Sequence, residues 1–144
     1  MLVEKVFNLL LIVKLMNFFK NLLESYKHIP YTIKHIWAMY KLQIKYIGYI
    51  KFPFHDFDKL FMFIFLGFIG TEKISKIHRK YAKHHLSLNK KFTFDNILEA
   101  VLDWESARFT KPDKPLNAWN TCIQYYPEWK LYVEDILVKY KIPK

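Results

Sequence analysis

Cysteine is nearly absent from this chain, and glycine and arginine are scarce. Cys122 is the only cysteine, which excludes a disulfide scaffold and is typical of a reducing, intracellular setting. With 3 glycines and 6 prolines, the composition also excludes a collagen-like or linker protein. Arginine is limited to Arg79 and Arg108, whereas proteins that read particular phosphates or bases usually rely on arginine forks.

Acidic residues are in the minority as well. There are 13 of them against 23 basic residues, so this is a basic protein with a net charge of +10. Such a surplus attracts polyanions, namely nucleic acids, nucleotides and anionic membranes, without choosing among them. Because 52% of the residues are hydrophobic and 19% are aromatic, the chain is able to bury a core and is not disordered.

Long uncharged runs are missing too. The most apolar uncharged run, 60–71, falls well short of the about 20 residues that a membrane-spanning helix needs. Residues 1–26 are expected to form an amphipathic helical extension, since Asn17, Lys20, Asn21 and Glu24 recur at helical steps. We expect this extension to pack on the domain. The alternatives are a peripheral position on a membrane and contact with a partner subunit, including a second copy in a homodimer.

Apolar residues recur mostly at helical spacing, and alternating strand patterns are scarce. The length and these patterns predict an all-α, compact single-domain bundle of about seven helices. Pro30 is expected in the first turn of the second helix, where a missing N–H does no harm. The helices are expected at about 2–24, 31–47, 54–67 or 54–70, 71–86, 95–109, 116–124 and 128–140, with a loop at 111–115.

The six histidines all lie between His28 and His85. In the helix expected at 71–86, four lysines share an arc of about 80°, while His78 and His85 project to the opposite side with Ile74 and Tyr81. A buried imidazole needs a partner for each nitrogen, and a metal ion supplies one. Those two histidines are therefore candidate ligands.

Further candidates follow in chain order on separate segments. They are His35, the consecutive pair His55 and Asp56 with Lys59 four residues after His55, and then Glu99 and Asp103, which share a helical face. Taken singly, each is most often an ordinary core or surface residue. Their conjunction in this order favours a site.

This order resembles that of the HD superfamily of metal-dependent phosphohydrolases, all-α domains in which a His, a His-Asp pair and a later Asp bind a metal. The chain is similar, more closely, to a family of uncharacterised HD-like proteins from bacteria, phages and large DNA viruses. The resemblance covers about 27–127 and is carried by Lys27-His28-Ile29, His35, His55-Asp56-Phe57-Asp58-Lys59, His78, His84-His85, Glu99, Asp103-Trp104 and Pro115-Leu116-Asn117.

The resemblance implies that residues 27–144 form an HD-like metal-binding domain that hydrolyses a nucleotide or another phosphoester. The implied cofactor is a divalent transition metal (manganese, iron, cobalt or zinc), as one or two ions. The expected location is the cytoplasm, or the host cytoplasm or virion if the chain is viral. The expected ligands are His35, His55, Asp56 and Asp103, with His78, His84 and His85 for a second ion or for phosphate contacts. Asp56, Lys59 and Glu99 carry the implied catalytic roles: Asp56 bridges two ions, Lys59 binds phosphate, and Glu99 orients a ligand histidine.

The alternative is a non-catalytic helical module with a structural metal that binds nucleic acid or another polyanion. Its contact surface is then the basic face of the helix expected at 71–86, formed by Lys73, Lys76, Arg79, Lys80 and Lys83. The aromatic residues of that helix are not interleaved with its basic residues in a stacking pattern, so we prefer the enzyme.

Overall fold

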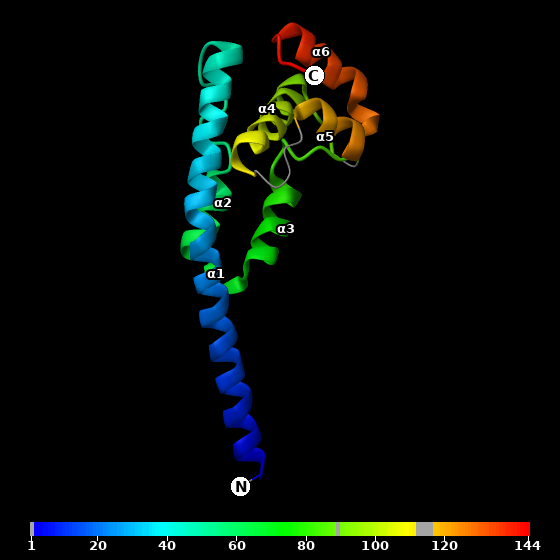
Figure 1. Ribbon diagram of the computed structural model, residues 1–144. Coiled ribbons are helices and arrows are strands. Elements are labelled where there is room, and N and C mark those ends of the chain that lie inside the picture. Colours follow the sequence, from blue (N-terminus) through cyan, green and yellow to red (C-terminus); the bar gives the residue numbers. More distant parts are fainter. Residues whose placement is uncertain (1, 89, 112–116) are drawn as a thin grey trace. The chain divides into compact units, whose positions relative to one another are not determined.

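The computed structural model describes residues 2–88, 90–111 and 117–144 (Figure 1). These residues form helices and no strand, which confirms the all-α prediction. The predicted loop at 111–115 lies mostly outside the described residues. The described part has six α-helices and two short 3₁₀ turns: α1 (Leu2–Ile47), α2 (Phe57–Phe65), η1 (Gly67–Ile69), α3 (Thr71–Tyr81), α4 (Phe94–Thr110), α5 (Ala118–Tyr125), η2 (Pro127–Trp129) and α6 (Lys130–Lys139).

Helix α1 is one continuous helix, so the prediction of separate helices at 2–24 and 31–47 is wrong. Pro30 lies inside it and removes a single main-chain hydrogen bond, while helical side-chain spacing continues on both sides. In the following turn the hydroxyl of Thr32 donates to the carbonyl of His28 at 2.9 Å. The helix ends as predicted before Gly48, whose φ of 92° favours glycine.

The chain forms two compact units. The first contains the chain up to Thr32 together with Asp56–Arg79, and the second contains Ile33–His55 and Lys80–Lys144. The expected division into 1–26 and 27–144 stays a prediction, and α1 continues through residue 26 without a break.

In the first unit, η1 packs against one side of α1. The Phe68 ring stacks on Phe18 with centroids 5.6 Å apart, and the Asn21 amide donates to the Phe68 carbonyl at 3.1 Å. The Ser25 hydroxyl donates to the carbonyl of Gly67 at 2.9 Å, and a Cβ at Gly67 would lie 2.9 Å from the Ser25 Cβ. Glycine is therefore required at position 67 for this close approach.

The rest of the N-terminal half of α1 is exposed, contrary to the expectation that it packs on the domain. Apolar side chains between Val6 and Leu23 lie open to solvent. Among the described residues, α1 contains the one stretch that is long and apolar enough to cross a membrane, and none of that stretch is buried.

The core of the second unit lies where α4, α5 and α6 pack against one another. Helix α4 begins at a capping box in which Thr93 and Asn96 bond reciprocally. The buried apolar side chains of this core include Met39, Leu42, Leu98, Val101, Leu102, Ala118, Cys122, Trp129, Val133, Ile136 and Leu137.

Helix α3 ends at Tyr81, five residues before its predicted end. Ile74 and His78 are buried as predicted, whereas Tyr81 is exposed. His84 and His85 follow the helix in a turn, so the helical projection does not apply to them. His84 is buried and His85 is half-buried, the reverse of what an unbroken helix gives.

Candidate metal centre

Three predicted ligands of the second unit converge within it. The Asp103 Oδ1 atom lies 2.9 Å from His35 Nε2 and 3.7 Å from His55 Nε2, and the two Nε2 atoms are 3.3 Å apart. Two ligand atoms that are each about 2.1 Å from one ion are separated by about 3.0 Å at a right angle and by about 3.4 Å at the tetrahedral angle. This triad, two buried histidines and a half-buried aspartate, therefore has the spacing of one face of a metal site.

The other ring nitrogens of the two histidines have partners of their own. The Ser106 hydroxyl donates its one hydrogen to the Asp103 carbonyl at 2.7 Å, so it accepts from His35 Nδ1–H at 3.0 Å. Glu99 accepts from His55 Nδ1–H at 3.0 Å. The Nε2 atoms of both rings consequently face the Asp103 carboxylate, and this group of ligand atoms could hold a metal ion.

The carboxylates of this cluster are ionised. Burial raises the pKa of Glu99, but hydrogen bonds from His55 and His84 outweigh burial and lower it to about 2. Burial likewise opposes ionisation of Asp103, yet His35 and His55 hold its pKa well below the usual range. Deprotonated carboxylates are the form that binds divalent metals.

His84 joins the cluster through Glu99. Its Nδ1 lies 3.4 Å from Glu99 Oε1, and its ring centroid is 4.5 Å from that of His55. The ring of His85 follows at 4.5 Å from His84. Both histidines thus lie beside the triad, in the same unit.

The remaining predicted site residues form a second cluster, in the first unit. His78 lies between two carboxylates, with Nε2 3.0 Å from Asp56 Oδ1 and Nδ1 2.8 Å from Asp58 Oδ2. The ammonium of Lys59 is 3.8 Å from Asp56 Oδ2. Burial lowers the pKa of His78, but the hydrogen bonds to Asp56 and Asp58 outweigh it and raise that pKa above its ordinary value. Within this unit His78 therefore bridges two aspartates.

Two of these functional residues were missed by sequence reasoning. Asp58 is part of the quoted motif, but the sequence gave no reason to pair it with His78. Ser106 carries no sequence signal at all, since a serine three residues after Asp103 is common on a helix. Its role follows only from its hydroxyl meeting His35 across 71 positions of sequence.

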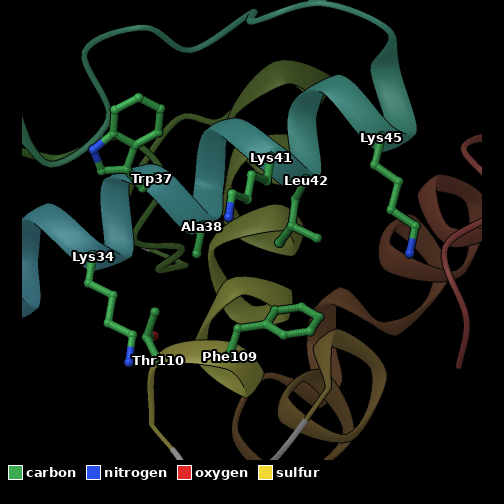
Figure 2. Close-up of a pocket in the computed structure, with 8 residues that line it drawn as sticks. All are labelled: Lys34, Trp37, Ala38, Lys41, Leu42, Lys45, Phe109 and Thr110. Carbon is green, nitrogen blue, oxygen red and sulfur yellow. The ribbon is translucent and has the colours of Figure 1, made fainter.

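Sequence reasoning also missed a basic pocket in the second unit. A cavity of about 390 Å³ lies between α1 and the C-terminal end of α4 (Figure 2). Lys34, Lys41 and Lys45 leave α1 on one side of that helix, and none of the lining residues is acidic. Trp37 and Phe109 line it as well and are more than half exposed. The pocket combines positive charge with aromatic surface.

Comparison with protein-family models, with curated proteins and with solved structures found no match. Interpretation of the site therefore depends on the geometry and chemistry of the residues described above.

Proposed function

We propose that the protein is a metal-dependent phosphohydrolase of the HD-like kind, acting on a nucleotide or another phosphoester. The observation that carries this proposal is the convergence of the buried His35 Nε2 and His55 Nε2 on Asp103 Oδ1. Each of the two histidines presents its Nε2 to the same carboxylate oxygen, while its Nδ1 is bonded to Ser106 or to Glu99. This arrangement suits manganese, iron, cobalt or zinc.

A divalent ion bound at the triad supplies Lewis acidity and lowers the pKa of a coordinated water. The protein's own residues prepare that chemistry. Ser106 and Glu99 fix the tautomers and ring planes of His35 and His55, which keeps both Nε2 atoms aimed at one position. Burial of His35 and His55 limits the access of competing water and strengthens the attraction of the site for a cation.

The other predicted residues retain proposed roles. His84 and His85, next to the triad, are candidates for a second ion or for contacts with a substrate phosphate. Asp56 and His78 keep the ligand roles that the HD-like resemblance implies. Lys59 keeps the phosphate-binding role, and its ammonium is already drawn toward a carboxylate.

Elemental analysis of protein purified without chelators tests the metal site. We expect bound transition metal in the wild type and its loss in Asp103→Asn, which keeps the side-chain shape but removes the charge. Asp135→Asn, at an exposed aspartate, is the matched control and should retain the metal. Equal metal content in all three proteins contradicts the ligand assignment. Asp56→Asn then reports whether that residue contributes a ligand.

Catalysis needs its own assay. The wild type is screened against nucleotides and generic phosphoesters with added manganese, cobalt or iron. Activity that requires metal and disappears in Asp103→Asn supports the phosphohydrolase. If the protein binds metal but hydrolyses none of these phosphoesters, the metal has a structural role and the alternative function is favoured.

That alternative, a helical module that binds a polyanion, is favoured by the pocket in Figure 2. Proteins that bind single-stranded nucleic acid combine lysines with exposed aromatic rings, because the lysines contact the phosphates and the bases stack on the rings. Lys34, Lys41 and Lys45 with Trp37 supply both on one unit. The pocket is thus a second candidate contact surface, in addition to the lysine face of α3.

Fluorescence anisotropy with a labelled single-stranded oligonucleotide tests it. We expect affinity to fall steeply with salt, and Lys41→Glu to weaken binding and reduce the salt slope by about 1. Lys73→Glu, on α3, is the control and should matter less. If Lys73→Glu has the larger effect, the originally predicted basic face is the contact surface.

A further inference from the structure

The N-terminal half of α1 carries an apolar surface that its own unit leaves mostly uncovered. Its side chains are between 40% and 66% exposed although they are large and apolar. Soluble monomers rarely expose so much contiguous apolar surface, and larger patches mark interaction sites. The exposed set comprises Val6, Phe7, Leu9, Leu10, Leu11, Ile12, Val13, Leu15, Met16, Phe18, Phe19 and Leu23.

This surface has two parts. Residues 9–13 are apolar in succession, and at about 100° per residue they point to every side of the helix. From Lys14 onward the helix is two-sided. Polar residues gather on one side, and η1 covers an edge through Phe18, Asn21 and Ser25. On the remaining side lies an uncovered stripe: Ile12, Leu15, Met16, Phe19 and Leu23.

A lipid bilayer fits this surface better than a second copy of the chain does. A partner helix covers one stripe of its neighbour, so it would leave most of residues 9–13 in water. A bilayer surrounds the first part on all sides and also accepts the one-sided stripe. The positive net charge of +10 adds attraction to anionic headgroups.

The charges also indicate how deeply the helix enters. Residues 6–23 are about 27 Å long as a helix, close to the about 30 Å of a bilayer core. Spanning would place Lys14 near the middle of the hydrocarbon, where an ammonium is costly. In the interface, by contrast, Lys14 and Lys20 reach the headgroups while the stripe faces the acyl chains.

We propose that residues 6–23 insert into the interface of a lipid bilayer, with the stripe of Ile12, Leu15, Met16, Phe19 and Leu23 toward the acyl chains. The proposal concerns the first unit alone and does not depend on a metal or on hydrolysis. It gives the protein a membrane surface as its place of action, in addition to whatever the second unit does.

Flotation of the full chain with vesicles tests the proposal. We expect binding to phosphatidylcholine vesicles, and tighter binding when a minor fraction of phosphatidylglycerol is added. Leu15→Gln and Met16→Gln should each weaken binding on the order of tenfold. Asn17→Gln, on the polar side, is the matched control and should bind as the wild type does. All three side chains are exposed, so thermal unfolding of the variants should match that of the wild type.

An environment-sensitive label reports the orientation. It is attached at Ile12→Cys or at Asn17→Cys, and Cys122 is buried and does not compete for it. On vesicles we expect a strong blue shift at position 12 and a weak one at 17. Equal strong shifts overturn the interfacial position in favour of a spanning helix. Absence of flotation, or a vesicle-independent dimer that Leu15→Gln dissociates, overturns the membrane proposal altogether.

Discussion

Replacement of Ser106 by alanine tests the assignment of the metal triad without touching a proposed ligand. The Ser106 hydroxyl is buried, donates to the Asp103 carbonyl at 2.7 Å and accepts from His35 Nδ1–H at 3.0 Å. Alanine removes both contacts and leaves the Nδ1–H of His35 without an acceptor on this side. The chain then has two ways to respond.

If His35 keeps its tautomer, a buried donor is left unsatisfied, which costs about 1–3 kcal/mol of stability. If instead the proton moves to Nε2, it donates to Asp103 Oδ1, which is already 2.9 Å away. That proton then occupies the position where a metal would bind. We therefore expect Ser106→Ala to lose about 1 kcal/mol of stability without metal, and metal affinity to fall roughly 10- to 100-fold, equivalent to about 1.4–2.7 kcal/mol.

A matched control lies one turn further along α4. The Thr110 hydroxyl also donates to a main-chain carbonyl, that of Ser106 at 3.2 Å, but Thr110 has no described hydrogen bond to a histidine. Thr110→Val should cost a similar amount of stability and leave metal affinity unchanged. Competition with a chelating dye measures the affinity for zinc or cobalt, and urea unfolding of the metal-free proteins measures stability.

Two results would refute this reasoning. Wild-type metal affinity in Ser106→Ala means that the tautomer of His35 is not set by Ser106, or that His35 is not a ligand. An equal loss of affinity in Thr110→Val means that both substitutions act through the backbone of α4 and not through the imidazole.

Three further predictions concern the fold. Burial raises the pKa of the Cys122 thiol to about 11. A thiol-specific disulfide reagent at mildly alkaline pH should therefore react with Cys122 only after the protein is unfolded in guanidinium. Reaction with the folded protein contradicts this prediction. Gly67→Ala should lose about 1–3 kcal/mol in urea unfolding, because its Cβ would lie 2.9 Å from the Ser25 Cβ and force η1 away from α1; an unchanged midpoint shows that η1 is not held there. Thr93→Ala should lose about 1 kcal/mol in thermal unfolding, since it removes the cap bond to the Asn96 N–H, and no loss argues against the capping box.

The spacing of apolar side chains in the sequence predicted several of the helices well. Periodicity identified α4, α5 and α6 to within a few residues, and Gly48 marked the end of α1. Such sequence rules were wrong at Pro30, where one lost hydrogen bond was taken as a boundary. A proline excludes one donor, and the chain on either side decides whether the helix continues.

In the candidate site, too, some residues could be predicted from the sequence and others could not. His35, His55 and Asp103 were chosen for their order in the sequence, and the structure places them within 3.7 Å of one another. The role of Ser106 depends on a contact between distant segments of the chain, and no local sequence pattern predicts such a contact. Lys34 and Lys41 are seven residues apart, so their shared helical side was visible in the sequence. The sequence did not show that Phe109 would line the same pocket.

Asp56 gives up local stabilisation of its backbone and of its side chain, and its carboxylate is buried. Its φ of 57° is left-handed, which costs an L-residue about 1–2 kcal/mol, and it precedes α2 without forming a side-chain cap. Glycine would remove the first cost, and a carboxylate free to cap would gain a hydrogen bond. The side chain is instead buried against His78 and Lys59, at 3.0 and 3.8 Å. A position that forgoes both local gains is held by the partners of its carboxylate, His78 and Lys59.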